Sequence, residues 1–281
     1  MVHREVQSMR RLIGLALIAL ALVRISPVVA QEKTDEPITK FFEPREYIVK
    51  DIGTLKYRLL KPVDYNPNHT YPLVIFLHGA GERGDDNIAQ LKHGMKDFLE
   101  PERRKKYPCY VLAPQCPTGK KWVEVDWSAE SHEQPSEPSV SMRLTHDLVL
   151  EMIETANVNK NRVYITGLSM GGYGTWDAIG RYPNLFAAAV PICGGGDPAT
   201  VEKFAKLPVW AFHGDKDTAV PVERSRMMIE ALKKAGGEPK YTEYPGVGHD
   251  SWSATFANPE LYDWLFTQLR REEIDPKDLK N

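Results

Sequence analysis

Residues 163–175 read V-Y-I-T-G-L-S-M-G-G-Y-G-T and contain the pattern G-x-S-x-G at positions 167–171. An apolar, strand-like run ends at Gly167, and a helix-like segment follows. A serine at such a strand-to-helix turn has its hydroxyl pushed clear of the backbone. Gly167 and Gly171 lack a Cβ, so the turn can be sharp, and the helix directs its free N–H groups at the serine. We therefore predict that Ser169 is a nucleophile; the alternative is a loop serine beside a chance pair of glycines.

Strand-like and helix-like segments alternate along the chain on both sides of this turn. Strands that alternate with helices form a mostly parallel sheet with helices on both faces, and continuous apolar runs suit strands buried on both sides. We predict an α/β fold with one catalytic domain at 42–275. An N-terminal β-ribbon is expected at 42–62, with strands at 47–49 and 55–60. Further strands are expected at 73–77, 110–113, 187–192, 208–212 and 240–244, and helices at 140–156, 222–235 and 259–270.

The length and composition are those of a soluble globular protein. The chain has 281 residues, of which 42% are hydrophobic and 26% charged, and its formal net charge is -2. This charge gives no indication of a nucleic-acid partner. The three cysteines are too few for a disulfide scaffold, and no spacing of Cys, His or acidic residues suggests a metal site. We therefore expect neither a metal nor a cofactor.

The N-terminus has the pattern of a secretory signal peptide. Arg10 and Arg11 precede an apolar run at 12–23, and the small residues at 28–30 offer a cleavage site. We predict a signal peptide at 1–30, a flexible leader at 31–41, and a secreted or periplasmic protein that is not inserted in the membrane after cleavage. The alternative is an uncleaved N-terminal membrane anchor, although the apolar run is short for one.

A serine hydroxyl needs a base to remove its proton, and this base is usually a histidine oriented by a carboxylate. In hydrolases with this strand–turn–helix unit, the acid follows the serine and the histidine comes last. His249, in the glycine-containing loop after the last strand, satisfies this order. Asp217 precedes a turn into a helix and is favoured as the acid over Asp215, which is expected to bind loop N–H groups. His213 is interpreted as a structural hydrogen-bonding residue.

An ester carbonyl develops negative charge when it is attacked, and backbone N–H groups usually stabilise it. We predict that Met170, directly after the nucleophile, supplies one of these groups. The second is expected from the H-G-A-G-E-R-G loop at 78–84, with Ala80 as the first choice and Gly81 as the next. A phosphate-binding loop is the alternative for this segment, but its sequence does not match the P-loop pattern.

Residues 119–139 form the one substantial insertion and are expected near the active site. This insertion is too polar for core and too aromatic for a plain linker. Trp127 in the insertion and Trp252 after the predicted base are candidates for substrate binding, because an indole ring can stack on a sugar or an aryl group. Trp122 and Trp176 lie near strand ends as well, with core packing as the alternative, above all for Trp176.

Five segments, taken together, resemble those of the α/β-hydrolase superfamily. They are L-H-G-A-G-E-R-G-D-D-N (77–87), A-P-Q-C-P (113–117), T-G-L-S-M-G-G-Y-G-T-W (166–176), H-G-D-K-D-T-A-V-P (213–221) and G-H-D-S-W (248–252). More narrowly, the chain is similar to secreted carboxylesterases related to the prolyl oligopeptidase catalytic domain, a group that includes phospholipase/carboxylesterase-like, dienelactone-hydrolase-like and feruloyl or acetylxylan esterase-like enzymes. The resemblance implies the single-domain α/β-hydrolase fold. It also implies Ser169 as nucleophile, Asp217 as acid and His249 as base.

The favoured function is a secreted serine carboxylesterase that hydrolyses small-molecule or carbohydrate-linked esters through an acyl-enzyme. One alternative is a prolyl-oligopeptidase-like serine peptidase, which the missing β-propeller sequence disfavours. A second is a non-catalytic binding protein on a hydrolase scaffold, which the complete set of Ser, Asp and His disfavours.

Overall fold

A computed structural model describes residues 36–270. The expected signal peptide and the expected domain boundary at residue 275 lie outside these residues. Within 36–270, no helix combines the length and the apolar character needed to cross a bilayer. A short 3-10 helix covers Ile38–Lys40, inside the segment expected to be a flexible leader. Ile38 and Phe41 pack against the buried core, so ordered structure already begins before the first strand.

Eight strands form one sheet in the order β1-β2-β4-β3-β5-β6-β7-β8. The β1–β2 and β2–β4 pairs are antiparallel, whereas all other neighbouring pairs are parallel. The predicted mostly parallel sheet is therefore confirmed, with the N-terminal ribbon joined to its edge. The strands are β1 (Phe42–Val49), β2 (Gly53–Leu60), β3 (Tyr71–Leu77), β4 (Tyr110–Pro114), β5 (Val158–Leu168), β6 (Ala188–Ile192), β7 (Trp210–Gly214) and β8 (Lys240–Tyr244).

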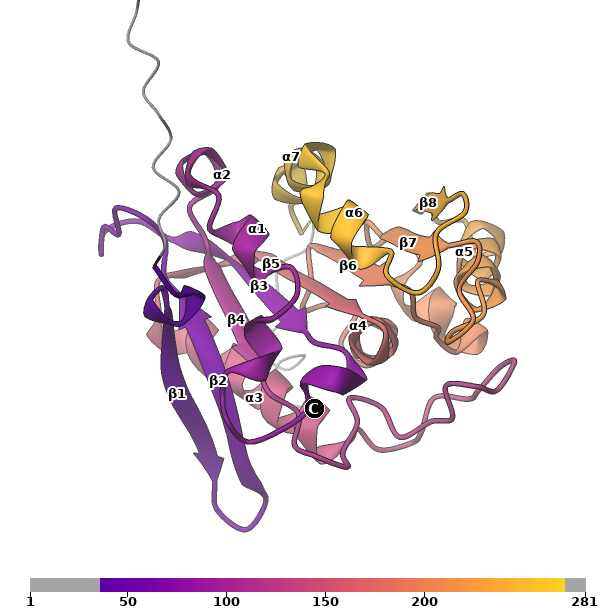
Figure 1. The fold of residues 1–281 in the computed structure, drawn as a ribbon, viewed down its shortest axis with the longest axis horizontal. Helices are drawn as coiled ribbons and strands as arrows, with labels where there is room; N and C mark the ends of the chain where they lie inside the picture. The colour runs from indigo at the N-terminus through magenta and orange to yellow at the C-terminus, as the bar shows by residue number, and fades with distance from the viewer. Residues whose placement is uncertain (1–35, 271–281) are drawn as a thin grey trace, which may run out of the picture. The chain divides into compact units, whose positions relative to one another are not determined.

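Helices cover both faces of the sheet (Figure 1). On one face lie α3 (Val140–Thr155), α4 (Met170–Arg181) and α5 (Glu223–Lys234), whose apolar residues belong to one buried cluster. The helices α1 (Met95–Phe98), α6 (Trp252–Ala257) and α7 (Pro259–Thr267) belong to the cluster on the other face. The short α2 (Pro101–Lys106) contacts α7 through Arg103, whose guanidinium carbon lies 3.8 Å from the centre of the Tyr262 ring.

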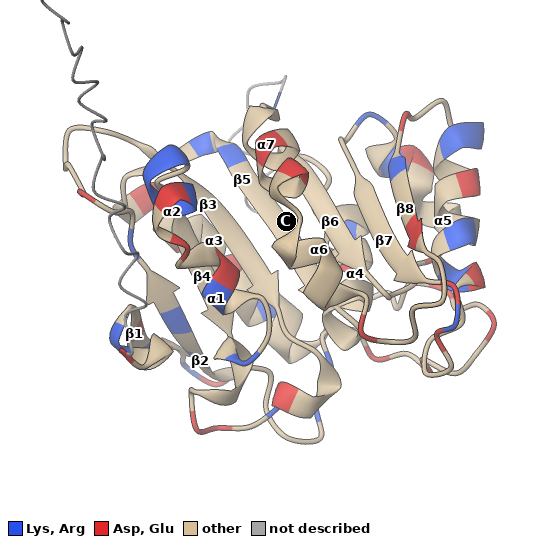
Figure 2. Ribbon diagram, turned by 45° about the horizontal axis from the view of Figure 1, so that its top comes forward, with Lys and Arg blue, Asp and Glu red and all other residues tan. Residues whose placement is uncertain are grey.

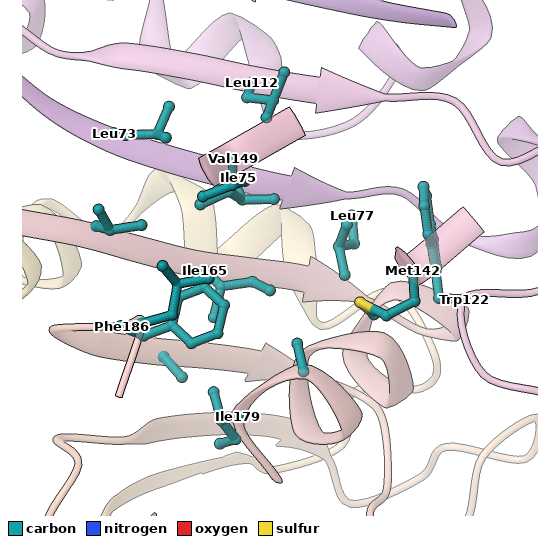
Figure 3. Close-up of a cluster of buried hydrophobic side chains, with 14 of the residues drawn as sticks. Leu73, Ile75, Leu77, Leu112, Trp122, Met142, Val149, Ile165, Ile179 and Phe186 are labelled. Atoms are coloured by element: carbon teal, nitrogen blue, oxygen red, sulfur yellow. The ribbon is translucent and has the colours of Figure 1, made fainter. Parts of the chain in front are cut away.

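The two-residue period of the central strands divides the core between these two faces. In β3, Leu73, Ile75 and Leu77 point into the cluster with α3 and α4 (Figure 3), whereas Val74 and Phe76 belong to the opposite cluster. All five side chains are fully buried. Complete burial of such a side chain contributes about 1.5–3 kcal/mol, so the unbroken apolar run of β3 stabilises both layers at once.

The polar candidates for the active site all follow strands at the same edge of the sheet. Strands β3, β4, β6 and β7 carry no charged residue at all (Figure 2). Ala80, Ser169, Asp217 and His249 come shortly after β3, β5, β7 and β8, which run parallel to one another. Because the carboxyl ends of parallel strands meet at one edge, this topology gathers the four residues there.

Some element boundaries differ from the sequence-based expectation. Strand β5 begins at Val158 rather than at residue 163, since Val158 pairs with Tyr71 of β3 although polar residues follow it. The last helix ends at Thr267 rather than at residue 270, because Gln268 is extended, with a ψ of 136°. The helices α1, α2 and α6 were not predicted; each has six residues or fewer, too few to show a helical period.

Candidate active site

Ser169 occupies the strand-to-helix turn between β5 and α4. Its backbone has φ 54° and ψ -118°, a conformation that costs a non-glycine residue on the order of 1–3 kcal/mol. A Cβ on Gly167 would lie 2.3 Å from the Gly171 carbonyl oxygen, and one on Gly171 would lie 1.9 Å from the Leu77 oxygen. Both glycines are therefore required, and their close approach sets the turn against the end of β3.

The structure brings the three predicted catalytic side chains into one hydrogen-bonded chain. His249 Nε2 lies 2.9 Å from Ser169 Oγ, and His249 Nδ1 lies 2.7 Å from Asp217 Oδ2. The carboxylate accepts a hydrogen bond from Nδ1–H, which leaves the lone pair of Nε2 free to accept the serine proton. The side chain of Asp217 is 0% exposed and that of His249 28% exposed, so the acid is buried and the base reaches the surface.

Asp217 is held in its charged form by the groups around it. Burial by itself raises the pKa of this carboxyl, but hydrogen bonds from His213, His249 and the backbone of Val220 overcome that effect and place the pKa well below its usual range. Its Oδ1 accepts from the N–H groups of Ala219 and Val220, at 2.8 and 2.9 Å. The turn into α5 therefore fixes the carboxylate that faces His249.

His213 contacts the same carboxylate from behind. Its side chain is fully buried, and its Nε2 lies 3.2 Å from Asp217 Oδ2 and 3.0 Å from the Val220 carbonyl oxygen. Since a carbonyl only accepts, Nε2 carries the hydrogen in this arrangement. Nδ1 lies 2.8 Å from Ser225 Oγ. His213 thus bonds to the acid loop, as the sequence suggested, while Asp215 accepts from Gly246 N–H at 2.7 Å.

Ala80 and Met170, the predicted oxyanion donors, each begin a helical turn beside Ser169. Ala80 is the first residue of a 3-10 helix (Ala80–Glu82), and Met170 is the first residue of α4. Within residues 36–270, neither backbone N–H donates a hydrogen bond. The contact between Gly171 and Leu77 brings the two segments together. Two free donors therefore lie on the two chain segments that flank the serine.

His78 fixes the loop that carries Ala80. This side chain is 1% exposed, and its Nε2 accepts from Cys116 N–H at 2.9 Å. Its Nδ1 lies 2.6 Å from the Gly79 carbonyl oxygen. Because Nε2 accepts, Nδ1 must be the protonated nitrogen, and the ring is a neutral tautomer. Burial lowers the pKa of His78 to about 4, so the ring stays neutral above that pH.

We expect this buried histidine to make the folded protein sensitive to mild acid. Below its ordinary pKa of 6.5, His78 takes up a proton in the unfolded chain but not in the folded one until about pH 4. The unfolded state then binds more protons, so stability falls with pH; between pH 7.5 and 4.5 the expected loss from this group is about 2–3 kcal/mol. Urea unfolding at the two pH values measures the loss.

His78→Gln removes the titrating group, and His69→Gln, at an exposed position, is the matched control. The difference in unfolding free energy between pH 7.5 and 4.5 should shrink in His78→Gln and stay unchanged in His69→Gln. An equal difference in wild type and His78→Gln would show that His78 does not carry the effect.

Cys193 lies behind the three catalytic candidates. Its Sγ, a carboxylate oxygen of Asp217 and a ring nitrogen of His249 all lie within 4.8 Å of one another, the one such group of potential metal ligands between residues 36 and 270. The carboxylate and the imidazole are bonded to each other, and burial raises the pKa of the fully buried thiol, which stays protonated. A buried, protonated thiol is a poor nucleophile and a poor ligand, so Ser169 is the better-placed nucleophile.

The insertion at 119–139 contributes to the core more than its composition suggested. Trp122 is 0% exposed and donates from Nε1 to the His78 carbonyl oxygen at 3.0 Å. Val123 and Val125 are buried against Tyr173. The interpretation of the insertion as too polar for core is therefore wrong for its first half, since Trp122 supports the loop that carries Ala80. Trp176, 1% exposed, is also a core residue.

Trp127 and Trp252, the two substrate-binding candidates, are only partly buried. The ring of Trp252 lies 5.3 Å from that of His249 in an edge-on arrangement. Trp127 lies between two cations, with Arg83 5.9 Å and Lys121 4.7 Å from its ring centre. Arg83 also donates to the Ala80 carbonyl oxygen at 2.9 Å. Both rings thus flank the catalytic residues, one beside the base and one beside the predicted oxyanion loop.

Sequence reasoning missed Arg224, a fully buried arginine on α5 beside Tyr173. Its position, seven residues after Asp217, gives no signal of burial, because the residues that cover it come from the distant insertion. The three cysteines are all unpaired and buried.

Comparison with known proteins places this site in a family. A model of the Phospholipase/Carboxylesterase family matches residues 63–260. The solved structure of a thermostable esterase is 43% identical, with a TM-score of 0.77, and the match covers 83% of this chain and 64% of that one. Acyl-protein thioesterase 1 of Neurospora crassa is 29% identical over 63% of this chain and 80% of its own length.

A fungal relative is much longer than this chain. It is an uncharacterized secreted protein of Arthroderma benhamiae, 26% identical over 78% of this chain and over only 26% of its own length. The chain therefore spans less than two thirds of both the esterase structure and this secreted protein. The family model, in contrast, covers most of the chain, including the predicted oxyanion loop, the serine turn and both residues bonded in series behind Ser169. The chain belongs to the Phospholipase/Carboxylesterase family of the α/β-hydrolase fold.

Proposed function

We propose that this protein is a secreted serine carboxylesterase in which Ser169 is the nucleophile, His249 the base and Asp217 the acid. The observation that carries the proposal is the continuous hydrogen-bonded chain from Ser169 Oγ through both nitrogens of His249 to Asp217. The lone pair of Nε2 faces the hydroxyl that must lose its proton. The buried carboxylate stabilises the imidazolium that forms when the proton is transferred.

The reaction proceeds through an acyl-enzyme. His249 takes the proton of Ser169 as Oγ attacks the ester carbonyl, and the oxygen that becomes negative accepts hydrogen bonds from the N–H groups of Ala80 and Met170. Two such donors contribute several kcal/mol to the transition state. His249 then gives its proton to the departing alcohol. A water molecule, deprotonated by His249, attacks the acyl-enzyme, and the acid leaves as the proton returns to Ser169.

Two classes of leaving group, alcohols from esters and thiols from thioesters, are compatible with this mechanism. The relative from Neurospora crassa is named a thioesterase, and the more similar solved structure is named an esterase. An alcohol and a thiol both leave the same tetrahedral intermediate, so one site can serve both. We place carboxylic esters first because the structure named an esterase shares higher sequence identity with this chain than the thioesterase does.

The two partly buried tryptophans support an aromatic or carbohydrate-linked substrate. The side chains of Trp127 and Trp252 are partly exposed, although within residues 36–270 their Nε1–H groups are buried and donate no hydrogen bond. The exposed part of an indole ring can stack on a sugar or an aryl ring. Secretion is supported by the N-terminal sequence pattern and by the name of the Arthroderma benhamiae relative.

Active-site labelling tests this proposal directly. A fluorophosphonate probe should modify one peptide, the one that contains Ser169, and abolish hydrolysis of 4-nitrophenyl acetate and butyrate in parallel. The panel also includes an acyl thioester and an aminoacyl 4-nitroanilide. Hydrolysis of the esters and not of the anilide would support an esterase, whereas labelling at any other residue, or full activity after labelling of Ser169, would refute the mechanism.

A further inference from the structure

Arg224 is a buried cation without a matching anion. It is the second residue of α5 and is 0% exposed. Within residues 36–270, no carboxylate lies within ion-pair distance of its guanidinium. Arg181, whose side chain is 9% exposed, shows the usual solution, since its Nε donates to Asp177 Oδ2 at 2.8 Å. The charge of Arg224 is therefore unbalanced by any protein side chain in this part of the chain.

The groups that touch Arg224 are all neutral. One guanidinium nitrogen donates to the Ala129 carbonyl oxygen at 3.3 Å, another donates to His132 Nδ1, and Nε has no partner. The guanidinium carbon lies 5.4 Å from the centre of the Tyr173 ring. Burial and the neighbouring Arg224 lower the pKa of His132 to about 4, and burial raises the pKa of Tyr173. Neither side chain carries a charge at neutral pH.

This arrangement is costly for the folded protein. Removing an arginine from water without a counter-ion costs several kcal/mol, and the N-terminal end of a helix repels a cation. Another buried arginine, Arg58, meets carbonyl oxygens from both Nε and Nη1, at 2.5 and 2.9 Å. Arg181 donates from Nε and from both terminal nitrogens, whereas Nε of Arg224 donates to nothing.

The unused edge of the guanidinium lies next to the residues that carry the catalytic candidates. Tyr173 is one turn after Ser169 in α4, with its N–H donating to the Ser169 oxygen at 3.0 Å. Arg224 itself follows the turn that holds Asp217, and its N–H donates to Pro221 at 3.0 Å. A Cβ on Gly195 would lie 2.6 Å from Arg224 Nε, so the Gly195 backbone packs directly against this buried nitrogen. The two terminal nitrogens, which face Ala129 and His132, are the ones that the insertion occupies.

A short part of the insertion covers Arg224; we call residues 128–133 the cover segment. The residues on either side are anchored: the Trp127 carbonyl accepts from Tyr173 at 3.1 Å, and Gln134 donates to Asp197 at 2.8 Å. Within the cover segment, Ser128 bonds to the neighbouring Asp126, at 2.9 Å from its N–H and 2.7 Å from its hydroxyl. From Ala129 to Glu133, the hydrogen bonds to the rest of the described protein are those that Arg224 makes with Ala129 and His132. Between its two fixed ends, the middle of the cover segment is therefore held by Arg224 and by the His132 ring, whose centre lies 5.7 Å from that of Tyr173.

We propose that Arg224 binds a carboxylate carried by the substrate, which replaces His132 on the guanidinium as the cover segment lifts. This inference rests on the proposed esterase function and defines its substrate class as esters that bear a second, ionised carboxyl group. A carboxylate matches the planar fork of arginine with two parallel hydrogen bonds and supplies the missing counter-ion. The carboxylate belongs either to the acyl part or to the alcohol part of the ester, and these sources are separable by experiment.

Matched ester pairs test the proposal. On the acyl side, 4-nitrophenyl butyrate is compared with mono-4-nitrophenyl glutarate; on the alcohol side, methyl 4-acetoxybenzoate is compared with 4-acetoxybenzoate. Arg224→Gln should lower kcat/KM at least tenfold for one charged ester and by less than twofold for its neutral partner. Arg226→Gln is the control: Arg226 lies on the same helix, is exposed, and pairs with Glu223 and Glu243, so it should change neither value.

A uniform loss on charged and neutral esters alike, or no change in either ratio, would overturn the proposal. If Arg224→Gln folds poorly, a binding measurement on a variant that retains Arg224 tests the proposal instead. Calorimetry with Ser169→Ala should show monomethyl glutarate binding at least tenfold more tightly than dimethyl glutarate, and equal affinities would also overturn the proposal. Failure of the esterase function itself is recognised separately, because wild type would then hydrolyse no ester in the panel.

Discussion

Replacement of Ser169 by alanine is expected to lower kcat/KM for 4-nitrophenyl butyrate by a factor on the order of 10⁵–10⁶. The reason is that His249 Nε2 then has no hydroxyl within reach, and the group 2.9 Å from it in the wild type is gone. The proposed oxyanion donors, Ala80 and Met170, are unchanged by this substitution, so a weak background rate is expected to remain. Initial rates at several substrate concentrations, with enzyme in the micromolar range, measure the loss.

The alanine variant should fold as the wild type does, because it removes one oxygen from a partly exposed side chain. Ser253→Ala, at an exposed position in α6, is the matched control and should keep wild-type activity. Thermal unfolding of both variants checks the fold. Retention of more than one hundredth of wild-type activity in Ser169→Ala, free of wild-type contamination, would mean that another residue is the nucleophile.

Replacement of Asp217 by asparagine is expected to lower kcat by a factor on the order of 10⁴. The charge that balances a protonated His249 is lost. The amide can also present its N–H₂ to His249 Nδ1, which stabilises the tautomer that has its hydrogen on Nε2 and cannot accept the serine proton. KM should change little, since Asp217 is 0% exposed and out of reach of substrate.

Comparison with His213→Gln separates the effect of the Asp217 charge from the effect of holding its carboxylate in place. His213 also contacts Asp217 Oδ2, but the carboxylate keeps the N–H groups of Ala219 and Val220 and the bond to His249 when His213 is replaced. The expected loss of kcat is about tenfold to a hundredfold, well below that of Asp217→Asn. A loss in Asp217→Asn no larger than in His213→Gln would show that Asp217 is not the acid of the site.

Much of the fold and the candidate site was predictable because the relevant signals are local. The serine turn needs glycines at fixed offsets, and strands buried on both faces need unbroken apolar runs. The structure of residues 163–175 and 73–77 can therefore be predicted from their own sequence. Ser169, Asp217 and His249 follow three parallel strands, β5, β7 and β8, so chain order and strand direction together indicate that the three residues lie at one edge of the sheet. For the same reason the parallel sheet and the meeting of the three side chains agree with expectation.

The errors concern residues whose environment is supplied by distant parts of the chain. The polar start of β5 is a strand because Val158 pairs with Tyr71, and Trp122 is core because it packs beneath His78. Polar composition in the insertion concealed both its apolar anchor and its role in covering Arg224. Local periodicity contains no information on such contacts.

The sequence by itself determined the α/β architecture, the turn that exposes Ser169 and the order of the groups behind it, since each depends on neighbouring residues or on chain direction. Only the tertiary structure decided which polar and charged side chains are buried. Burial keeps His78 neutral. The hydrogen bonds from His213, His249 and Val220 hold Asp217 in its charged form. Burial also leaves Arg224 without a counter-ion. The physical reason is that desolvation depends on the atoms that surround a group in space, and for these residues those atoms come from other segments of the chain.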